Sequence, residues 1–464
     1  MSVYDIFSDV AIASLFILVA QWLRSKVKFF QEFFVPASLI AGILGLIAGP
    51  QVLGRITGGS VALNFSSASG SYSGLLIIIV FTVVGLNGFE MKKGEGKEVL
   101  KRVGSYGCLR TFNMFIQFTV GIALTELVIA TVMPNLSHGF GILLASGFTG
   151  GHGTAAAVGK TFTDLGWAEG ADLGVTFATI GVILGVFGGV AFIKIATKKN
   201  WTVYIKDFKF LDNDLRTGMI APERQKSIGR EPISSVSLDS LAWHLALVCM
   251  VGGFGYLLNA KVLAPYVIKG IPDFTVSYLV ALFFFLATRK MPFYEKYVDK
   301  RINSRISGTA TDYLVFFAVA KLNLTVIVEY AVPLLVCSLG GLIIVVLGVI
   351  PLGAKLNEKS WFERSMFCYG YGTGVFAIGF VLLRILDPEN RSHTVEDTAM
   401  FPFLSFAEVV LWSAIPVALL KGAGSSWAVA GICFAISIAA LIIAKVLGWW
   451  FKGPLAGREG YFDN

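Results

Sequence analysis

Charged residues are scarce in this sequence. Asp, Glu, Lys and Arg make up 15% of its 464 residues, whereas hydrophobic residues make up 55%. An average soluble domain contains about 25% charged residues. The deficit extends over the whole length, so too little polar surface remains to cover a soluble body of this size. The composition therefore predicts an integral membrane protein.

Cysteine and histidine are also rare. The five cysteines stand singly, an odd number cannot all pair within one chain, and no CxxC occurs. The four histidines lack the spacing of metal ligands; they are His138, His152, His244 and His393. We therefore expect neither a disulfide framework nor a zinc site.

Long apolar runs recur along the chain, and about 20 apolar residues are needed to cross a bilayer as a helix. The alternating segments of a transmembrane barrel are missing, so the predicted fold class is all-α. The first run, 4–23, lacks signal-peptide flanks and is expected to be a retained helix. About eleven spans are expected, at 5–23, 34–50, 73–90, 103–133, 170–196, 238–258, 273–289, 309–322, 330–352, 396–420 and 427–450. Two further apolar pieces, 139–162 and 362–386, are interrupted by glycines.

The net charge of +8 orients these spans rather than indicating a nucleic-acid partner. If the N-terminus lies outside and both interrupted pieces are re-entrant, nearly all basic residues fall on the cytoplasmic side. Outside remain only Arg55, Lys261, Lys269 and Lys421. This asymmetry is what the positive-inside rule expects. It predicts an outer N-terminus and a cytoplasmic C-terminus; a contact with membrane lipid is expected but needs no special site.

The chain divides into two similar halves. The first contains Gly151-His152-Gly153-Thr154 and the second Gly370-Tyr371-Gly372-Thr373, each after four spans and before a fifth. Because the number of spans per half is odd, the second half enters from the opposite face. Inverted repeats whose broken helices meet near the midplane are typical of secondary transporters. We expect a first repeat at 1–197, a cytoplasmic linker at 198–237, a second repeat at 238–421, and an additional helix and tail at 422–464.

Glycine at the two tips leaves backbone polar groups accessible. Irregular backbone inside a membrane is tolerated where protein or water satisfies its polar groups, and glycine leaves those groups open to a ligand. Helix N-termini offer N–H donors to an anion, while freed carbonyls coordinate a cation. The alternative is that small residues only permit close helix packing.

The first tip resembles a known family. Gly150-Gly151-His152-Gly153-Thr154-Ala155-Ala156-Ala157 looks like the Gly-Gly-His-Gly-Thr signature of the bacterial glutamate:sodium symporters, and the segments at 84–87 and 176–185 are similar to theirs. The resemblance implies sodium-coupled uptake of an anionic amino acid across the bacterial inner membrane, a mobile transport unit on a scaffold, and a homodimer. The second tip departs from the family, which typically has Gly-Phe-Gly-Leu-Gly followed by Ala-Thr-Pro. Here Gly374 is followed by Val375-Phe376-Ala377.

Candidate ligands lie at the tips and near them. Substrate contacts are expected from Gly150, Gly151, His152, Gly153, Thr154, Asn87, Gly370, Tyr371, Gly372, Thr373, Gly374 and Arg384. Candidate sodium ligands are Glu408, Thr154 and Thr373. Each has a structural alternative: His152 satisfies loop carbonyls, the threonines bond to the preceding helical turn, Asn87 bonds to a neighbouring helix, and Arg384 extends to an aqueous surface. Glu408 inside an apolar span requires a cation partner or a proton.

Other functions fit less well. A potassium filter has Thr-Val before its Gly-Tyr-Gly, whereas this chain has Cys368-Tyr369. A phosphate loop requires four residues between its glycines, and five separate Gly153 from Gly159. No arrangement of nucleophile and base stands out, so an enzyme is not expected. The sequence thus predicts a sodium-coupled symporter of a small carboxylate with elevator-like alternating access; the alternative is proton coupling, and an ion channel is less favoured.

Overall fold

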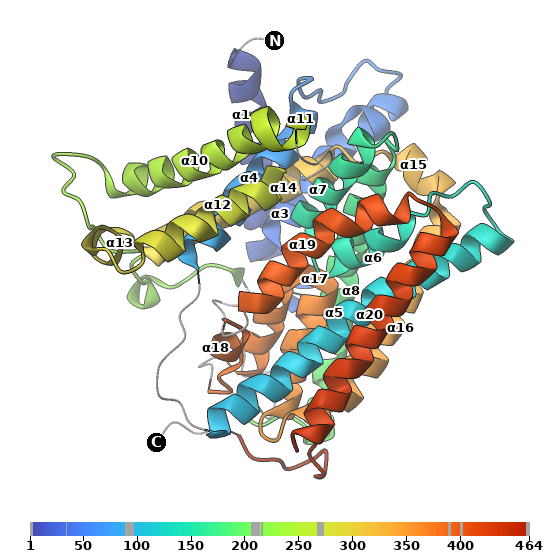
Figure 1. The fold of residues 1–464 in the computed structure, drawn as a ribbon. Helices are drawn as coiled ribbons and strands as arrows, with labels where there is room; N and C mark the ends of the chain where they lie inside the picture. The colour runs from blue at the N-terminus through green and yellow to red at the C-terminus, as the bar shows by residue number, and fades with distance from the viewer. Residues whose placement is uncertain are drawn as a thin grey trace.

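The computed structural model describes residues 3–33, 35–88, 97–205, 214, 217–266, 273–387, 391–399 and 402–460. Within these ranges all regular secondary structure is helical (Figure 1). Seven of the described helical stretches are long and apolar enough to cross a membrane: 4–26, 37–54, 98–131, 170–198, 240–266, 331–356 and 423–446. This is the architecture of a multi-pass helical membrane protein. The larger count of about eleven spans remains a prediction.

The helices of the first half are drawn in blue to green in Figure 1. They are α1 (Val3–Lys26), α2 (Lys28–Glu32), α3 (Ala37–Ala48), a π-helical turn (Pro50–Gly54), α4 (Ser69–Asn87), α5 (Lys97–Thr131), α6 (Phe140–Phe148), α7 (Gly151–Asp164) and α8 (Gly170–Lys198). The interrupted piece predicted at 139–162 therefore forms two helices, α6 and α7.

The second half begins after the polar segment, whose described part holds one 3-10 turn (Pro222–Arg224). Its helices are α10 (Ser240–Leu258), a π-helical turn (Asn259–Leu263), α11 (Ala264–Tyr266), α12 (Asp273–Thr288), α13 (Pro292–Tyr297), α14 (Lys300–Ala320), α15 (Leu324–Glu329), α16 (Ala331–Leu356), α17 (Trp361–Leu386), α18 (Thr394–Ala399), α19 (Pro402–Leu419) and α20 (Ala423–Val446). α14 begins earlier than predicted because Asp299 caps it, accepting the N–H of Arg301 at 2.7 Å. The span predicted at 396–420 falls on α18 and α19, and residues 400 and 401 between them lie outside the described residues.

The helices pack in two groups. One contains α1, α3, α4, α10, α12 and α14, in which α1 lies on α3, α10 on α12, α4 on α12, and α14 on both α3 and α4. The other contains α5, α6, α7, α8, α16, α17 and α20, with α5 against α6, α16 against α17, and α5 against both α16 and α20. Figure 1 shows α6, α7 and α17 in the middle of the bundle, with α5, α16 and α20 along one side.

Apolar side chains fill the interior and also cover parts of the surface. One large core cluster joins α8, α16 and α17 around residues such as Val186, Val345 and Phe367. On α1 and α20, in contrast, large apolar side chains are exposed, for example Leu18 and Ile432. Exposed apolar faces of this extent suit contact with hydrocarbon or another chain rather than water.

Candidate functional site

α6 and α7 form a helical hairpin. The chain leaves the helix at Thr149–Gly150, and Gly151 has φ +69°, a left-handed conformation that glycine adopts without steric cost. At the other end, a Cβ on Gly139 would lie 2.6 Å from the Phe162 ring. The start of α6 therefore lies beside the end of α7. The Gly150–Gly153 segment is the tip of this first hairpin.

α17 is a second hairpin rather than one straight helix. Its backbone is non-helical at Gly374 (φ −134°, ψ 33°) and Val375 (φ 65°, ψ 175°). A Cβ on Gly370 would lie 2.7 Å from the Cα of Gly379. In a straight α-helix the Cα atoms of these two glycines would be about 13 Å apart. The helical halves before and after the break at 374–375 therefore fold back on each other.

The two hairpin tips meet. A Cβ on Gly151 would overlap the Cγ1 atom of Val375, so the two breaks are in direct contact. α8 covers the junction from the side: a Cβ on Gly185 would lie 2.7 Å from the Thr373 hydroxyl oxygen. The structure thus brings together the two Gly-x-Gly-Thr segments that the sequence analysis selected.

His152 is buried at the first tip, 5% exposed. Its Nε2 atom lies 3.1 Å from the Thr179 hydroxyl oxygen, and that hydroxyl donates to the carbonyl of Val175 at 3.0 Å. Because the hydroxyl proton is already used, Thr179 accepts from His152, which assigns the proton to Nε2. His152 is thus tied to α8 by one ring nitrogen.

The two tip threonines are both buried. The Thr373 hydroxyl donates to the carbonyl of Tyr369 at 2.9 Å. This is the bond to the preceding helical turn that is the structural alternative to a ligand role. Thr154 packs against Gly150, where a Cβ would lie 2.5 Å from the Thr154 Cβ. Thr149, which the sequence analysis did not select, has a buried hydroxyl oxygen with no hydrogen-bond partner among the described residues.

α5 presents a polar face toward α17, from the base of the second hairpin to its tip, and none of its residues is among the predicted site residues. The residues recur every three or four positions: Arg102, Tyr106, Arg110, Asn113 and Gln117. The Arg110 guanidinium lies 4.5 Å from the centre of the Tyr371 ring, and the Asn113 amide nitrogen donates to the carbonyl of Cys368 at 3.3 Å. Polar residues at helical spacing in an apolar span were the available signal.

Two predicted site residues, Asn87 and Arg384, have their described contacts away from the tips. Asn87 ends α4 and its amide donates to the Ser304 hydroxyl at 3.1 Å and accepts from Asn303 at 3.2 Å. Arg384 is exposed near the end of α17, with its guanidinium 4.7 Å from the Phe380 ring. The side chain of Glu408 lies outside those that the structure describes.

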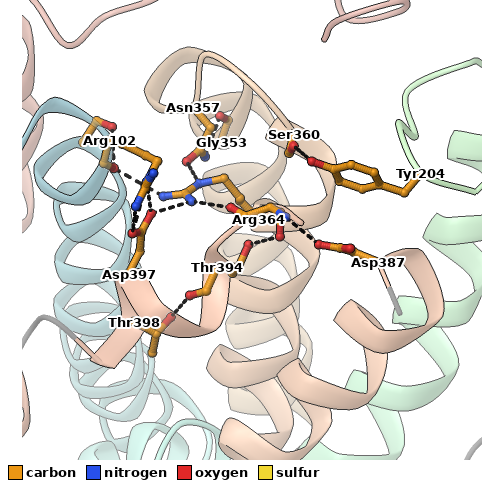
Figure 2. A network of polar contacts seen from close by, with 12 residues as sticks. Arg102, Tyr204, Gly353, Asn357, Ser360, Arg364, Asp387, Thr394, Asp397 and Thr398 are labelled. Atoms are coloured by element: carbon orange, nitrogen blue, oxygen red, sulfur yellow. Dashed lines mark hydrogen bonds and ion pairs between the residues drawn. The ribbon is translucent and has the colours of Figure 1, made fainter. Parts of the chain in front are cut away.

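A buried ion-pair network lies at the opposite end of α17 from its tip. Arg364, fully buried, donates to Asp397 at 2.7 Å and to the side-chain oxygen of Asn357 at 2.8 Å. Arg102 donates three further hydrogen bonds to the same carboxylate, two at 2.8 Å and one at 3.1 Å. Figure 2 shows Asp397 between the two guanidinium groups. The network fastens α18 to both α5 and α17.

A cavity of about 980 Å³ lies between the two groups of helices. Its lining comes from α4, α10, α12 and α14 of the first group and from α7 and α8 of the second. Ala156 and Val175 reach it from the turns next to His152 and Thr179. Lys160 and Lys321 also line it, and Lys160 pairs with Asp164 at 2.8 Å. The cavity therefore approaches the first hairpin tip within about one helical turn.

Comparison with known proteins assigns this arrangement to a family. The model of a family described as sodium/glutamate symporter matches residues 3–373, which includes all of the first hairpin and the second up to its tip. The chain belongs to the sodium/glutamate symporter family. A relative named sodium/glutamate symporter, from Haemophilus influenzae, is 27% identical over 189 residues, a stretch that covers 40% of this chain and 43% of the relative.

Proposed function

We propose that this protein is a sodium-coupled secondary active symporter for glutamate or a related small carboxylate. The observation that carries the proposal is the contact between the two hairpin tips at Gly151 and Val375. Family membership supports a transporter that couples solute to sodium, and gives no reason to expect an enzyme. Proton coupling remains the alternative that the experiment below separates from sodium coupling.

The substrate site lies at the junction of the tips. α7 begins at Gly151 and the second half of α17 begins at Val375, so two helix N-termini converge there. Their free N–H groups and positive dipole ends favour a carboxylate. The hairpin halves that end at the junction present carbonyl oxygens, which favour Na⁺. His152, Thr154 and Thr373 add polar side chains at or beside this junction.

Alternating access follows from the two groups of helices. We assign the hairpins, with α5, α8 and α16, to a moving transport unit and α1, α3, α4, α10, α12 and α14 to a scaffold. The cavity lined by helices of both groups supports this division, because a sliding interface is expected to pack incompletely. The motion is elevator-like, and it carries the tip junction past the scaffold.

An inverted repeat accounts for the paired helix contacts. The contact of α1 with α3 in the first half is matched by the contact of α10 with α12 in the second. The contact of α4 with α12 is matched by the contact of α14 with α3. Likewise, the contact of α5 with α6 is matched by the contact of α16 with α17. These pairs support repeats at 1–197 and 238–421 joined by the linker at 198–237. In this arrangement the N-terminus is outside and the C-terminus cytoplasmic, in a bacterial inner membrane. The exposed apolar faces contact lipid or the second copy of a homodimer.

Uptake by proteoliposomes tests the function. Purified protein should accumulate labelled glutamate when Na⁺ is high outside, and a K⁺ gradient of the same size should not replace it. Uptake driven by a proton gradient alone, with equal Na⁺ on both sides, would instead indicate the proton-coupled alternative. If no amino acid, dicarboxylate or tricarboxylate is taken up under any cation gradient, the proposal is wrong.

A further inference from the structure

The polar face of α5 ends beside the second hairpin tip. A Cβ on Gly372 would overlap the Asn113 side-chain amide and lie 3.2 Å from the Gln117 amide nitrogen. Glycine at position 372 therefore lets the backbone of the tip approach both amides. Asn113 is 3% exposed and Gln117 is fully buried, so water does not reach either freely.

Both amides use their nitrogens and leave their oxygens without partners. The side-chain nitrogen of Asn113 donates to the backbone carbonyl of Cys368 at 3.3 Å. The side-chain nitrogen of Gln117 donates to the backbone carbonyl of Asn113 at 3.2 Å. These two bonds fix which end of each amide is the oxygen. The remaining atoms, Asn113 Oδ1 and Gln117 Oε1, have no hydrogen-bond partner among the described residues. A buried acceptor without a partner is costly, so two adjacent ones require an explanation.

The surroundings add acceptors of the same kind. The first half of α17 ends at the tip, and the last four carbonyls of a helix have no partner within it. That end of a helix also carries a partial negative charge. Amide and backbone carbonyl oxygens are ligands for hard cations, and they hydrogen-bond to an ammonium group equally well. They do not take up a proton at physiological pH.

We propose that Asn113 Oδ1 and Gln117 Oε1, beside Gly372, form a binding site for a small cation. The inference rests on the proposed function, which supplies two cations of suitable chemistry: the coupling Na⁺ and the ammonium group of an amino-acid substrate. Because neutral amides cannot carry the proton, occupation by Na⁺ favours sodium over proton coupling. Arg110 lies one turn earlier on α5, and its positive charge opposes a cation until a carboxylate binds nearby. We therefore expect cation and substrate to bind more tightly together than apart.

The test is a thermal-shift titration of the purified full-length protein with NaCl, at ionic strength held constant with choline chloride. A ligand of the folded state raises the midpoint of unfolding by mass action. In Asn113→Leu and Gln117→Met, which keep the side-chain volume, the apparent Na⁺ constant should rise about tenfold or more, because a buried ligand is lost. Thr119→Val is the matched control, since Thr119 lies on the same helix but bonds to the Ala430 carbonyl of α20 at 3.3 Å. Its Na⁺ constant should not change.

A second pair of variants keeps the proposal testable if the apolar variants do not fold. Asn113→Asp and Gln117→Glu keep an oxygen in place and add a negative charge, so the Na⁺ constant should fall below the wild-type value. An amide with a purely structural role would not produce tighter binding. Tighter binding in these variants, with weaker binding in the apolar ones, supports the site, and an unchanged or raised Na⁺ constant in the acidic variants contradicts it.

Glutamate and glutarate distinguish the two cations, because glutarate lacks the ammonium group. If the amides hold the ammonium group, the apolar variants keep the wild-type Na⁺ constant but lose the preference for glutamate over glutarate. If both the Na⁺ constant and that preference are unchanged, the cation site is wrong and the symporter proposal stands. If the wild-type protein responds to neither Na⁺ nor carboxylates, both proposals are wrong.

Discussion

Gly151 at the tip of the first hairpin lies so close to Val375 at the tip of the second that one methyl group added to the glycine would overlap the valine side chain. Both residues have positive φ, +69° and +65°. For glycine this conformation is free, whereas a β-branched residue adopts it only where its surroundings impose it. The tips thus constrain each other across the junction.

Gly151→Ala should abolish or strongly reduce uptake and lower the thermal stability. The left-handed backbone costs alanine roughly 1–2 kcal/mol, and overpacking against Val375 adds roughly 1–3 kcal/mol. Proteoliposome uptake and the unfolding midpoint measure the two effects. Gly431→Ala in α20 is the control, because a Cβ there meets nothing within 4 Å. It should keep both activity and stability.

Val375→Gly should partly rescue Gly151→Ala. The exchange removes the overlapping side chain and also relieves the positive φ at position 375. Residues in contact show non-additive effects of about 0.5–3 kcal/mol. Unfolding free energies of the two single variants and the double variant measure this coupling. Strictly additive losses would mean that the tips do not touch.

The hairpin positions could be predicted from the sequence because their cause is local. Glycines and a threonine interrupt an apolar run within a few residues at Gly151 and again at Gly372, and such breaks need no knowledge of other helices. Their convergence was inferred from the odd number of spans per half. That step used only the order of the elements along the chain.

The polar neighbours of the tips could not be selected in the same way. The spacing of Arg110, Asn113 and Gln117 is visible in the sequence, but only the packing of α5 against α17 gives it meaning. The pairing of Arg364 with Asp397 is likewise a tertiary contact. Arg384 was selected because it follows a tip, yet a helix carries a side chain away from its start by about 1.5 Å per residue.

Asp397→Ala should be the most destabilising change in the ion-pair network. It would leave the fully buried guanidinium of Arg364 facing that of Arg102 without a carboxylate. Removing one partner of a buried ion pair costs about 3–5 kcal/mol. Lys101→Ala is the control, because Lys101 pairs with Glu358 at the surface and such pairs contribute about 0–1 kcal/mol. Chemical unfolding measures both, and equal effects would contradict a buried network.

Arg384→Ala tests whether this arginine binds the substrate. Its guanidinium is exposed and stacks on Phe380, so we expect the apparent substrate constant to change by no more than about twofold, as for other surface positions. Uptake at varied glutamate concentration, with Na⁺ saturating, measures it. A much larger rise in the substrate constant, with the Na⁺ constant unchanged, would instead place Arg384 at the carboxylate.

Asp299 should make the docking of the linker depend on pH. Burial opposes its ionised form, but the backbone N–H groups of Arg230 and Arg301 and the Arg230 guanidinium hold the pKa of Asp299 below its usual value. A lowered pKa in the folded state contributes stability above the unfolded pKa of about 3.9, and this contribution is lost as the pH falls through the folded value.

Asp299→Ala should therefore lower the unfolding midpoint by the same amount at pH 8 and pH 5, through the loss of a helix cap worth about 1 kcal/mol and of the bonds to Arg230. Below about pH 4 the difference from wild type should shrink. His244 Nε2 accepts the backbone N–H of residue 299 at 2.8 Å, a bond to the backbone that the substitution leaves in place. Thermal unfolding of the two proteins across this pH range measures the effect. A difference that grew on acidification would mean that the carboxylate is not held in its ionised form.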